Sequence, residues 1–175
     1  MRILKILLKF LLIIIVIITV FGFWYYHHLK PSYSGEISLT SIEKETTVYF
    51  DDFGIPHIYA DSHIDAIVTL GYVQAQDRLW QLELMKRIAP GRLAELFGKD
   101  LIENDKFFAS LGIDEYSEIT VANLDPNSEV YLLMNAYLKG INQFIDEGPT
   151  PIEFILTGLK KEHFVMKDIY NVLGY

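Results

Sequence analysis

The chain has 175 residues, a net charge of −8 and no cysteine. Its first 30 residues carry four of the 15 basic residues and none of the 23 acidic ones, so the rest of the chain holds 11 bases against 23 acids. That acidic balance excludes nucleic-acid binding through clustered lysines and arginines. The absence of cysteine excludes disulfides and thiolate metal sites.

An apolar leader opens the chain. Its first nine residues carry three positive charges, and residues 10–26 (FLLIIIVIITVFGFWYY) carry no charge. Residues 7–26 are therefore long enough to cross a bilayer as a helix, which needs about 20 apolar residues. Residues 1–30 form either an uncleaved membrane anchor or a cleaved signal segment. We favour the anchor, because residues 23–26 (FWYY) are aromatic where a signal peptide needs small residues.

The charge distribution around the leader predicts its orientation. Basic residues precede the apolar segment, so the amino end should stay in the cytoplasm while the acidic remainder is exported. We therefore expect a single-pass protein of a bacterial cell membrane, or a periplasmic or secreted protein if the leader is cleaved. The pair His27 and His28 is interpreted as solvated side chains at the membrane surface rather than as metal ligands.

Residues 31–45 are predicted to form a stalk and a first strand, and residues 46–175 the globular part. Pro31 and Gly35 interrupt any regular structure in the stalk. Residues 36–42 (EISLTSI) alternate in polarity and residues 46–50 have strand chemistry, which predicts an antiparallel pair between them.

A hairpin and a long helix are predicted next. Residues 48–50 and 57–60 have strand chemistry and flank a turn with Gly54 and Pro56. The following helix should begin at Asp61 or Ser62 and stop at Pro90 and Gly91. Its apolar positions recur at i, i+3, i+4 and i+7, and they are Ile64, Ile67, Val68, Gly71, Tyr72, Ala75, Leu79, Leu82 and Met85.

Several acidic and histidine side chains gather around this hairpin. They are Asp51, Asp52, His57, Asp61, His63 and Asp65. Their spacing matches neither the HExxH motif nor an EF-hand loop. We interpret Asp52 and His57 as groups that satisfy the turn backbone, and Asp61 or Ser62 as the helix cap.

The long helix also carries Asp77 and Arg78 near its middle. A charge buried without a partner costs roughly several kcal/mol in stability. These two side chains are therefore predicted to belong to a structural network rather than to a catalytic site. Residues 91–98 should form a short helix between glycines. Residues 99–111 should form another, with Asp105 on its polar side.

The last third of the chain is predicted to be helical. Asp125 and Pro126 provide an N-cap and first-turn signal for a helix of about 20 residues that ends at Gly148. Residues 152–158 form a short apolar element, and residues 164–175 start a further helix capped near Asp168. That helix has no closing signal, as expected of a partial chain.

Five segments resemble the amino-terminal part of the first (alpha) subunit of the penicillin acylase (penicillin amidase) family of N-terminal-nucleophile hydrolases. They occur in the family's order and spacing, and they are Asp52 with Gly54-Ile55-Pro56-His57-Ile58, Gly71-Tyr72, Ala75-Gln76-Asp77-Arg78-Leu79, Gly91-Arg92 with Ala94-Glu95, and Gly98. Weaker likeness continues through Asp105 and residues 151–154.

The resemblance implies an α+β fragment of a four-layer αββα fold, mostly helical with a small antiparallel sheet. It also implies a hydrolase for linear amides such as penicillins, other N-acyl amides or N-acyl homoserine lactones. In the family, the nucleophile is the amino-terminal serine of a second (beta) subunit, and its own α-amino group is the base. Ser110 follows an alanine, as a processing site would, but it lies inside a predicted helix.

We therefore assign no catalytic, cofactor-binding or metal-binding residue to this chain. The resemblance allows calcium in the full-length enzyme. The expected partners are the missing second subunit, a small amide substrate and the membrane through residues 7–26, with no nucleic acid. One alternative stays open, in which the chain is a non-catalytic, membrane-anchored binding or assembly module that keeps the acylase scaffold.

Overall fold

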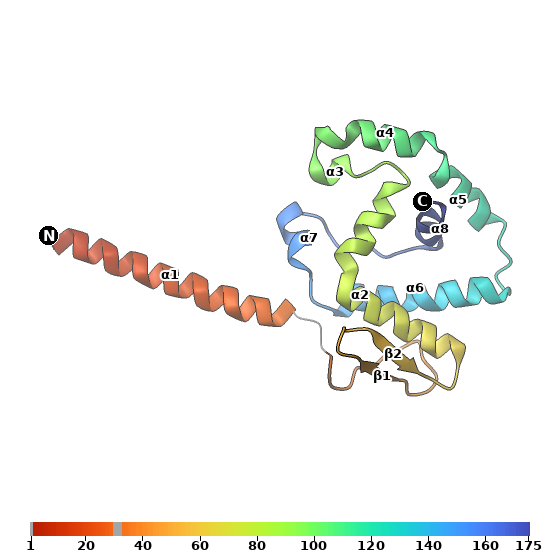
Figure 1. Cartoon of the computed structure of the whole chain (residues 1–175), viewed down its shortest axis with the longest axis horizontal. Coiled ribbons are helices and arrows are strands. Elements are labelled where there is room, and N and C mark those ends of the chain that lie inside the picture. The colour runs from red at the N-terminus through yellow and green to blue at the C-terminus, as the bar shows by residue number, and fades with distance from the viewer. Residues whose placement is uncertain (1, 30–32) are drawn as a thin grey trace. The chain divides into compact units, whose positions relative to one another are not determined.

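The computed structural model describes residues 2–29 and 33–175. They fall into two compact units, Met1–Ser32 and Tyr33–Tyr175. The described part of the first unit is one helix, α1 (Arg2–Leu29), shown in red in Figure 1. Its stretch Lys5–His27 is long and apolar enough to cross a membrane. At 1.5 Å per residue those 23 residues extend over about 35 Å.

The second unit is α+β and mostly helical, with one two-stranded antiparallel sheet in its described part. A hairpin comes first, two long helices form the core, and short helices surround them (Figure 1). In chain order the elements are β1 (Thr47–Phe50), β2 (Pro56–Tyr59), α2 (His63–Ile88), α3 (Ala94–Phe97), the 3-10 turn η1 (Lys99–Leu101), α4 (Ile102–Ser110), α5 (Ile113–Ala122), α6 (Glu129–Glu147), α7 (Ile152–Thr157) and α8 (Met166–Gly174).

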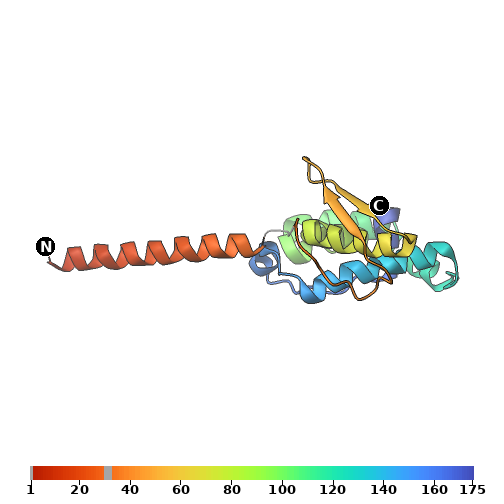
Figure 2. The same cartoon turned by 90° about the horizontal axis from the view of Figure 1, so that it is seen from below.

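Helices α2 and α6 pack against each other along the core (Figure 2). Tyr72 of α2 meets Phe144 of α6 edge to face, with ring centroids 5.5 Å apart. The backbones approach closely because Gly71 and Gly140 face the opposite helix, where a Cβ would overlap a carbonyl oxygen. Of the apolar positions predicted from helical periodicity, Tyr72, Ala75 and Leu79 are buried in this core, whereas Ile64 is 38% exposed. Each large buried side chain contributes roughly 1.5–3 kcal/mol.

The hairpin pairs β1 with β2, in a register that places Thr47 opposite Tyr59 and Phe50 opposite Pro56. This confirms the predicted hairpin, but the predicted strand at residues 36–42 is wrong. Those residues are irregular because distant side chains satisfy their backbone and that of the adjacent residues. Gln143 accepts from the Thr40 amide at 3.0 Å, and Asp65 accepts from the Glu43 amide at 3.0 Å.

Helix starts follow local capping. Ser62 caps α2, and its side chain accepts a hydrogen bond from the Asp65 amide. Of the two predicted starts of this helix, Asp61 and Ser62, the second is therefore confirmed. The predicted start of α6 at Asp125 and Pro126 is wrong. Asp125 instead closes a turn, its carboxylate accepting from the Asn127 amide, and Ser128 becomes the N-cap.

Two further elements differ from the prediction. The helix α5 was not predicted, and the segment 99–111 is divided into η1 and α4. Helix α8 starts at Met166, where Asp168 accepts from the Val165 amide at 2.8 Å. This start agrees with the cap predicted near Asp168.

Candidate functional site

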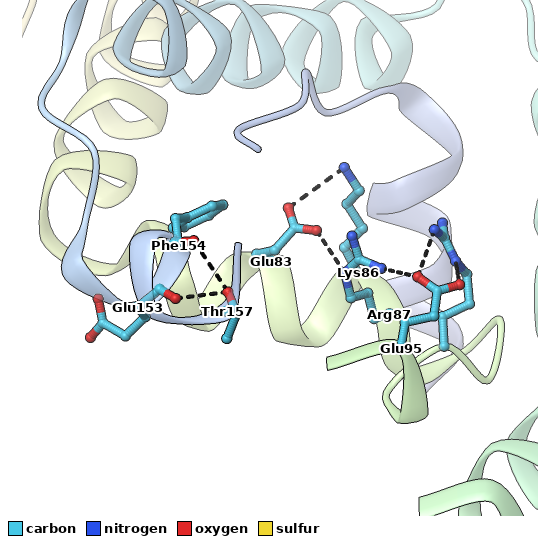
Figure 3. Close-up of polar contacts among 8 residues, drawn as sticks. Glu83, Lys86, Arg87, Glu95, Glu153, Phe154 and Thr157 are labelled. Carbon is cyan, nitrogen blue, oxygen red and sulfur yellow. Dashed lines mark hydrogen bonds and ion pairs between the residues drawn. The ribbon is translucent and has the colours of Figure 1, made fainter. Parts of the chain in front are cut away.

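The carboxyl-terminal half of α2 carries a buried cluster of charges. Glu83, Lys86 and Arg87 lie on one face of the helix because their spacing is i, i+3 and i+4. Glu83 is 1% exposed and Arg87 is 2% exposed. The Arg87 Nε lies 2.9 Å from the Glu83 carboxylate, and the Lys86 ammonium lies 3.7 Å from it. Figure 3 shows the Glu83 carboxylate directed at both cations.

A second carboxylate completes this cluster from α3. The Arg87 guanidinium donates to Glu95, which also accepts two bonds from Arg92, at 2.8 and 2.9 Å. These bonds, above all those from Arg92, lower the pKa of Glu95. Burial raises the pKa of Glu83, and the attraction of Lys86 and Arg87 offsets this only in part. The cluster therefore ties α3 to α2 through paired charges, as buried charges require.

Asp105 adds a further tie to this segment. Its two carboxylate oxygens accept the backbone amides of Leu93 and Ala94, at 2.9 and 2.7 Å. Asp105 is therefore buried at the start of α3, and its predicted place on a polar face of a helix is wrong. The error arises because the acceptors that α3 needs at its first turn come from α4, more than ten residues further along the chain.

The middle of α2 is bent at Arg78, whose φ of −144° and ψ of 35° are not helical. At the bend, Nε and Nη2 of Arg78 donate to one oxygen of Asp77 at 3.1 and 2.7 Å. The Tyr33 hydroxyl donates to the other oxygen at 3.4 Å. Asp77 and Arg78 thus pair with each other at a half-exposed position, instead of with neighbours in a buried network.

The described residues of the second unit form a pocket and a groove. A pocket of about 200 Å³ lies between the hairpin and α2, next to the bend. An open groove of about 490 Å³ runs beside α6 and residues 164–166. In the groove Asn142 both donates to and accepts from the backbone of Phe164, and Gln143 bonds to the Ser38 carbonyl and to Glu147. Asn142 and Gln143 therefore have a structural role, because their bonds hold other segments of the chain against α6.

The acidic and histidine side chains near the hairpin do not converge on one point. Asp51 accepts from the amides of Phe53 and Ile55 and pairs with His57 at 3.3 Å, so the role predicted for Asp52 falls to Asp51. The turn amides, the Ile55 bond above all, hold the pKa of Asp51 below its usual value. Asp61 pairs with Lys44, and Asp65 holds the amides of residues 43 and 44.

No nucleophile and base stand together in the hydroxyl bonds that the structure describes. Ser110 ends α4, where its hydroxyl donates to the Phe107 carbonyl at 2.7 Å. The hydroxyls of Thr40, Thr46, Thr69, Thr120, Ser128 and Thr157 bond to backbone groups, to Gln143 or to another threonine. These contacts cap and brace helices, and none of them activates an oxygen for attack on a carbonyl.

The fold defines the class of protein. The structure superposes on a thermostable penicillin G acylase from Alcaligenes faecalis with a TM-score of 0.62 and 24% identity, over 73% of this chain and 69% of that chain. The helical unit with its small sheet is accordingly part of an N-terminal-nucleophile hydrolase fold.

Sequence comparison is more specific. The penicillin amidase family model matches residues 45–175. The chain is 38% identical to the penicillin acylase 2 proenzyme of Pseudomonas sp. (strain SE83) over 133 residues, which is 75% of this chain and 17% of that protein. It is 35% identical to the penicillin G acylase of Escherichia coli over 112 residues, 64% of this chain and 13% of that protein.

An acyl-homoserine lactone acylase, QuiP of Pseudomonas aeruginosa, is 27% identical over 140 residues, 79% of this chain and 16% of that protein. The chain belongs to the penicillin amidase family. It spans less than a fifth of the length of these curated relatives.

Proposed function

We propose that this chain is the front of the first subunit of a membrane-anchored amidase that hydrolyses linear amides. Water splits the C–N bond of the substrate, giving a carboxylate and an amine, and a second subunit carries the serine nucleophile. The observation that supports this most is the family match over residues 45–175, in a chain that spans under a fifth of its relatives. The bonded hydroxyls of the scaffold fit this division, because they brace helices.

The exposed apolar side chains of the hairpin support the existence of a partner. Tyr49 and Tyr59 stack edge to face on its outer face, with centroids 5.7 Å apart, and are 63% and 62% exposed. Phe53 at the turn is 89% exposed, and Ile55 beside it is 54% exposed. Exposed apolar side chains gathered on one hairpin favour an interaction surface. We assign it to the second subunit, and we name these four residues the hairpin patch.

The leader supports a place at the membrane. Helix α1 has the length of a spanning helix, and its ring contacts between Phe21 and Trp24 and between Phe21 and Tyr25 gather aromatic groups near one end. Such groups favour the bilayer interface. We propose that α1 stays uncleaved and that the second unit lies on the exported side.

The substrate class follows from the relatives' names. Penicillin acylases are the more similar relatives, so the first candidate is a penicillin or another N-acyl amide. An N-acyl homoserine lactone is the second candidate, because the QuiP acylase aligns over a larger share of this chain.

The test is a reconstitution. The chain is expressed alone and together with the subunit encoded after it, and release of amine is measured with penicillin G and with an N-acyl homoserine lactone. We expect no hydrolysis by the chain alone and hydrolysis by the pair of subunits. The substrate that is hydrolysed at the higher rate identifies the substrate class. Hydrolysis by the chain alone would overturn the proposal. A stable but inactive pair would favour the binding or assembly module instead.

A further inference from the structure

The pocket beside the bend in α2 is lined by residues outside the charged cluster. From α2 it takes Leu70, Val73, Gln74, Asp77 and Arg78, a series with the spacing of one helix face, and from the hairpin Phe50, Gly54 and Pro56. Its apolar part therefore lies between two elements, and the Asp77–Arg78 pair stands at its polar side.

The bend in α2 lies at the Asp77–Arg78 pair, and both side chains are partly exposed. Proline, glycine or an inserted group accounts for most sharp bends in helices, whereas here the non-helical residue is an arginine. The hydrogen bonds described for Arg78 use Nε and Nη2, so Nη1 and the second Nη2 proton are left as donors for another acceptor. The side chains of Arg78 and Asp77 are 51% and 38% exposed, so a ligand reaches both.

The charges specify which ligand fits. A guanidinium edge binds a carboxylate through two parallel bonds, and a carboxylate oxygen accepts an ammonium. A plain carboxylic acid would be repelled by Asp77, and a plain amine by Arg78. A zwitterion with both groups on one carbon meets neither repulsion.

We propose that this pocket binds a free α-amino acid with an aliphatic side chain about the size of leucine. The ligand carboxylate lies on the outer edge of Arg78, its ammonium on Asp77, and its side chain among Phe50, Leu70 and Val73. The volume of about 200 Å³ supports a ligand this small, because sites for drug-sized ligands have about 300–1,000 Å³. The proposal concerns residues of this chain alone and stands apart from the amide hydrolysis proposed above.

The test compares three probes on the full chain in detergent micelles with 15N-labelled glycine. L-leucine is the complete ligand, 4-methylpentanoate lacks only its ammonium, and 3-methylbutylamine lacks only its carboxylate. The Gly54 amide reports on the pocket, and the Gly112 amide, remote in the chain, is the internal control. We expect saturable shifts of Gly54 with L-leucine at a Kd of about 1 mM, and at least tenfold weaker binding of both analogues.

Two variants assign the effect to the pair. Arg78→Gln and Asp77→Asn should each weaken L-leucine binding at least about tenfold, and Lys106→Gln, which removes an exposed cation on α4, should leave it unchanged. Circular dichroism establishes that each variant is folded. Equal binding of L-leucine and 4-methylpentanoate, shifts that survive in Arg78→Gln, or no saturable shift with the folded wild-type chain would each overturn the proposal.

Discussion

At the residue scale, charges and glycines decide how α2 is held. Long charged side chains are almost never buried unless they are paired, and Glu83 and Arg87 meet that condition through each other and through Glu95. Lys86 also lies 4.7 Å from the centre of the Phe164 ring, so one cation receives both a carboxylate and an aromatic face. The cluster fixes α3 and the segment at residue 164 on α2.

Replacing Glu83 by glutamine should destabilise the protein strongly. The change removes the ion-pair partner of the buried Lys86 and replaces a charged acceptor of Arg87 by a neutral one. Breaking a buried pair from one side costs about 3–5 kcal/mol, so we expect a loss of about 3 kcal/mol in urea unfolding of the chain together with its second subunit. The double variant Glu83→Gln with Lys86→Met should lose less than the sum of the two single changes. Additive losses would show that the two side chains are not coupled.

Gly140→Ala should also destabilise the protein, although alanine is the better helix former by about 1 kcal/mol. A Cβ there would overlap the Val68 carbonyl oxygen and lie 2.7 Å from the Tyr72 nitrogen, so α2 and α6 must move apart. Overpacking of this kind costs about 1–3 kcal/mol. Thermal unfolding should show a lowered midpoint, and Lys139→Ala, at the exposed neighbouring position, is the control. A raised midpoint would mean that the helices separate at little cost.

At the element scale, α5 and α8 are joined by one carboxylate. Asp114 of α5 accepts from Lys167 at 2.9 Å and from Asn171 at 2.8 Å, both on α8. Burial opposes the ionisation of Asp114, but these hydrogen bonds outweigh it and lower its pKa. Because the folded pKa lies below the unfolded one, the ionised group stabilises the protein above the ordinary value of about 3.9, and this contribution is lost as the pH falls through the folded pKa.

Asp114→Asn should therefore be less stable than the wild type near neutral pH and approach it in acid. Thermal unfolding of both proteins between about pH 7 and about pH 3 should show a difference that shrinks below about pH 4. Glu103→Gln, which breaks an exposed ion pair on α4, should give little difference at any pH. A difference that stays constant from neutral to acid pH would count against the ionised Asp114 as the link.

At the scale of the whole molecule, the second unit combines a packed α2–α6 core with apolar side chains that nothing in the described chain covers. Beyond the hairpin patch, α7 exposes Ile155 at 58% and Leu156 at 77%. A subunit that covers such surfaces removes them from water, and each buried large side chain contributes roughly 1.5–3 kcal/mol. We therefore expect the stability of this unit to depend on its partner.

Residues 31–175 expressed alone should be poorly soluble or only partly folded. The combined change Phe53→Ser with Tyr59→Ser should raise the soluble fraction, measured by centrifugation and light scattering, because it removes exposed apolar area from the hairpin patch. Tyr116→Ser is the matched control, since Tyr116 is 75% exposed on α5, outside the patch. Cooperative two-state unfolding of a monomeric 31–175 segment would contradict the expected dependence on a partner.

Local signals in the sequence were sufficient for part of this protein. The apolar leader, the hairpin around Gly54, the cap at Ser62 and the end of α6 at Gly148 all depend on residues close to one another in the chain. Periodicity and turn chemistry reflect such short-range preferences, so these features can be predicted from the sequence. The five family segments identified the penicillin amidase scaffold for the same reason, since they are read from residue types and spacing alone.

Only the tertiary structure decided where polar groups find partners. Residues 36–42 alternate like a strand, yet Gln143, over a hundred residues away, helps to satisfy the backbone there. Asp105 is buried because the amides of Leu93 and Ala94 need its carboxylate, and Asp77 accepts from the distant Tyr33 hydroxyl. A buried polar group needs a hydrogen-bond partner in place of water. That partner comes from whichever segment the fold brings close to it.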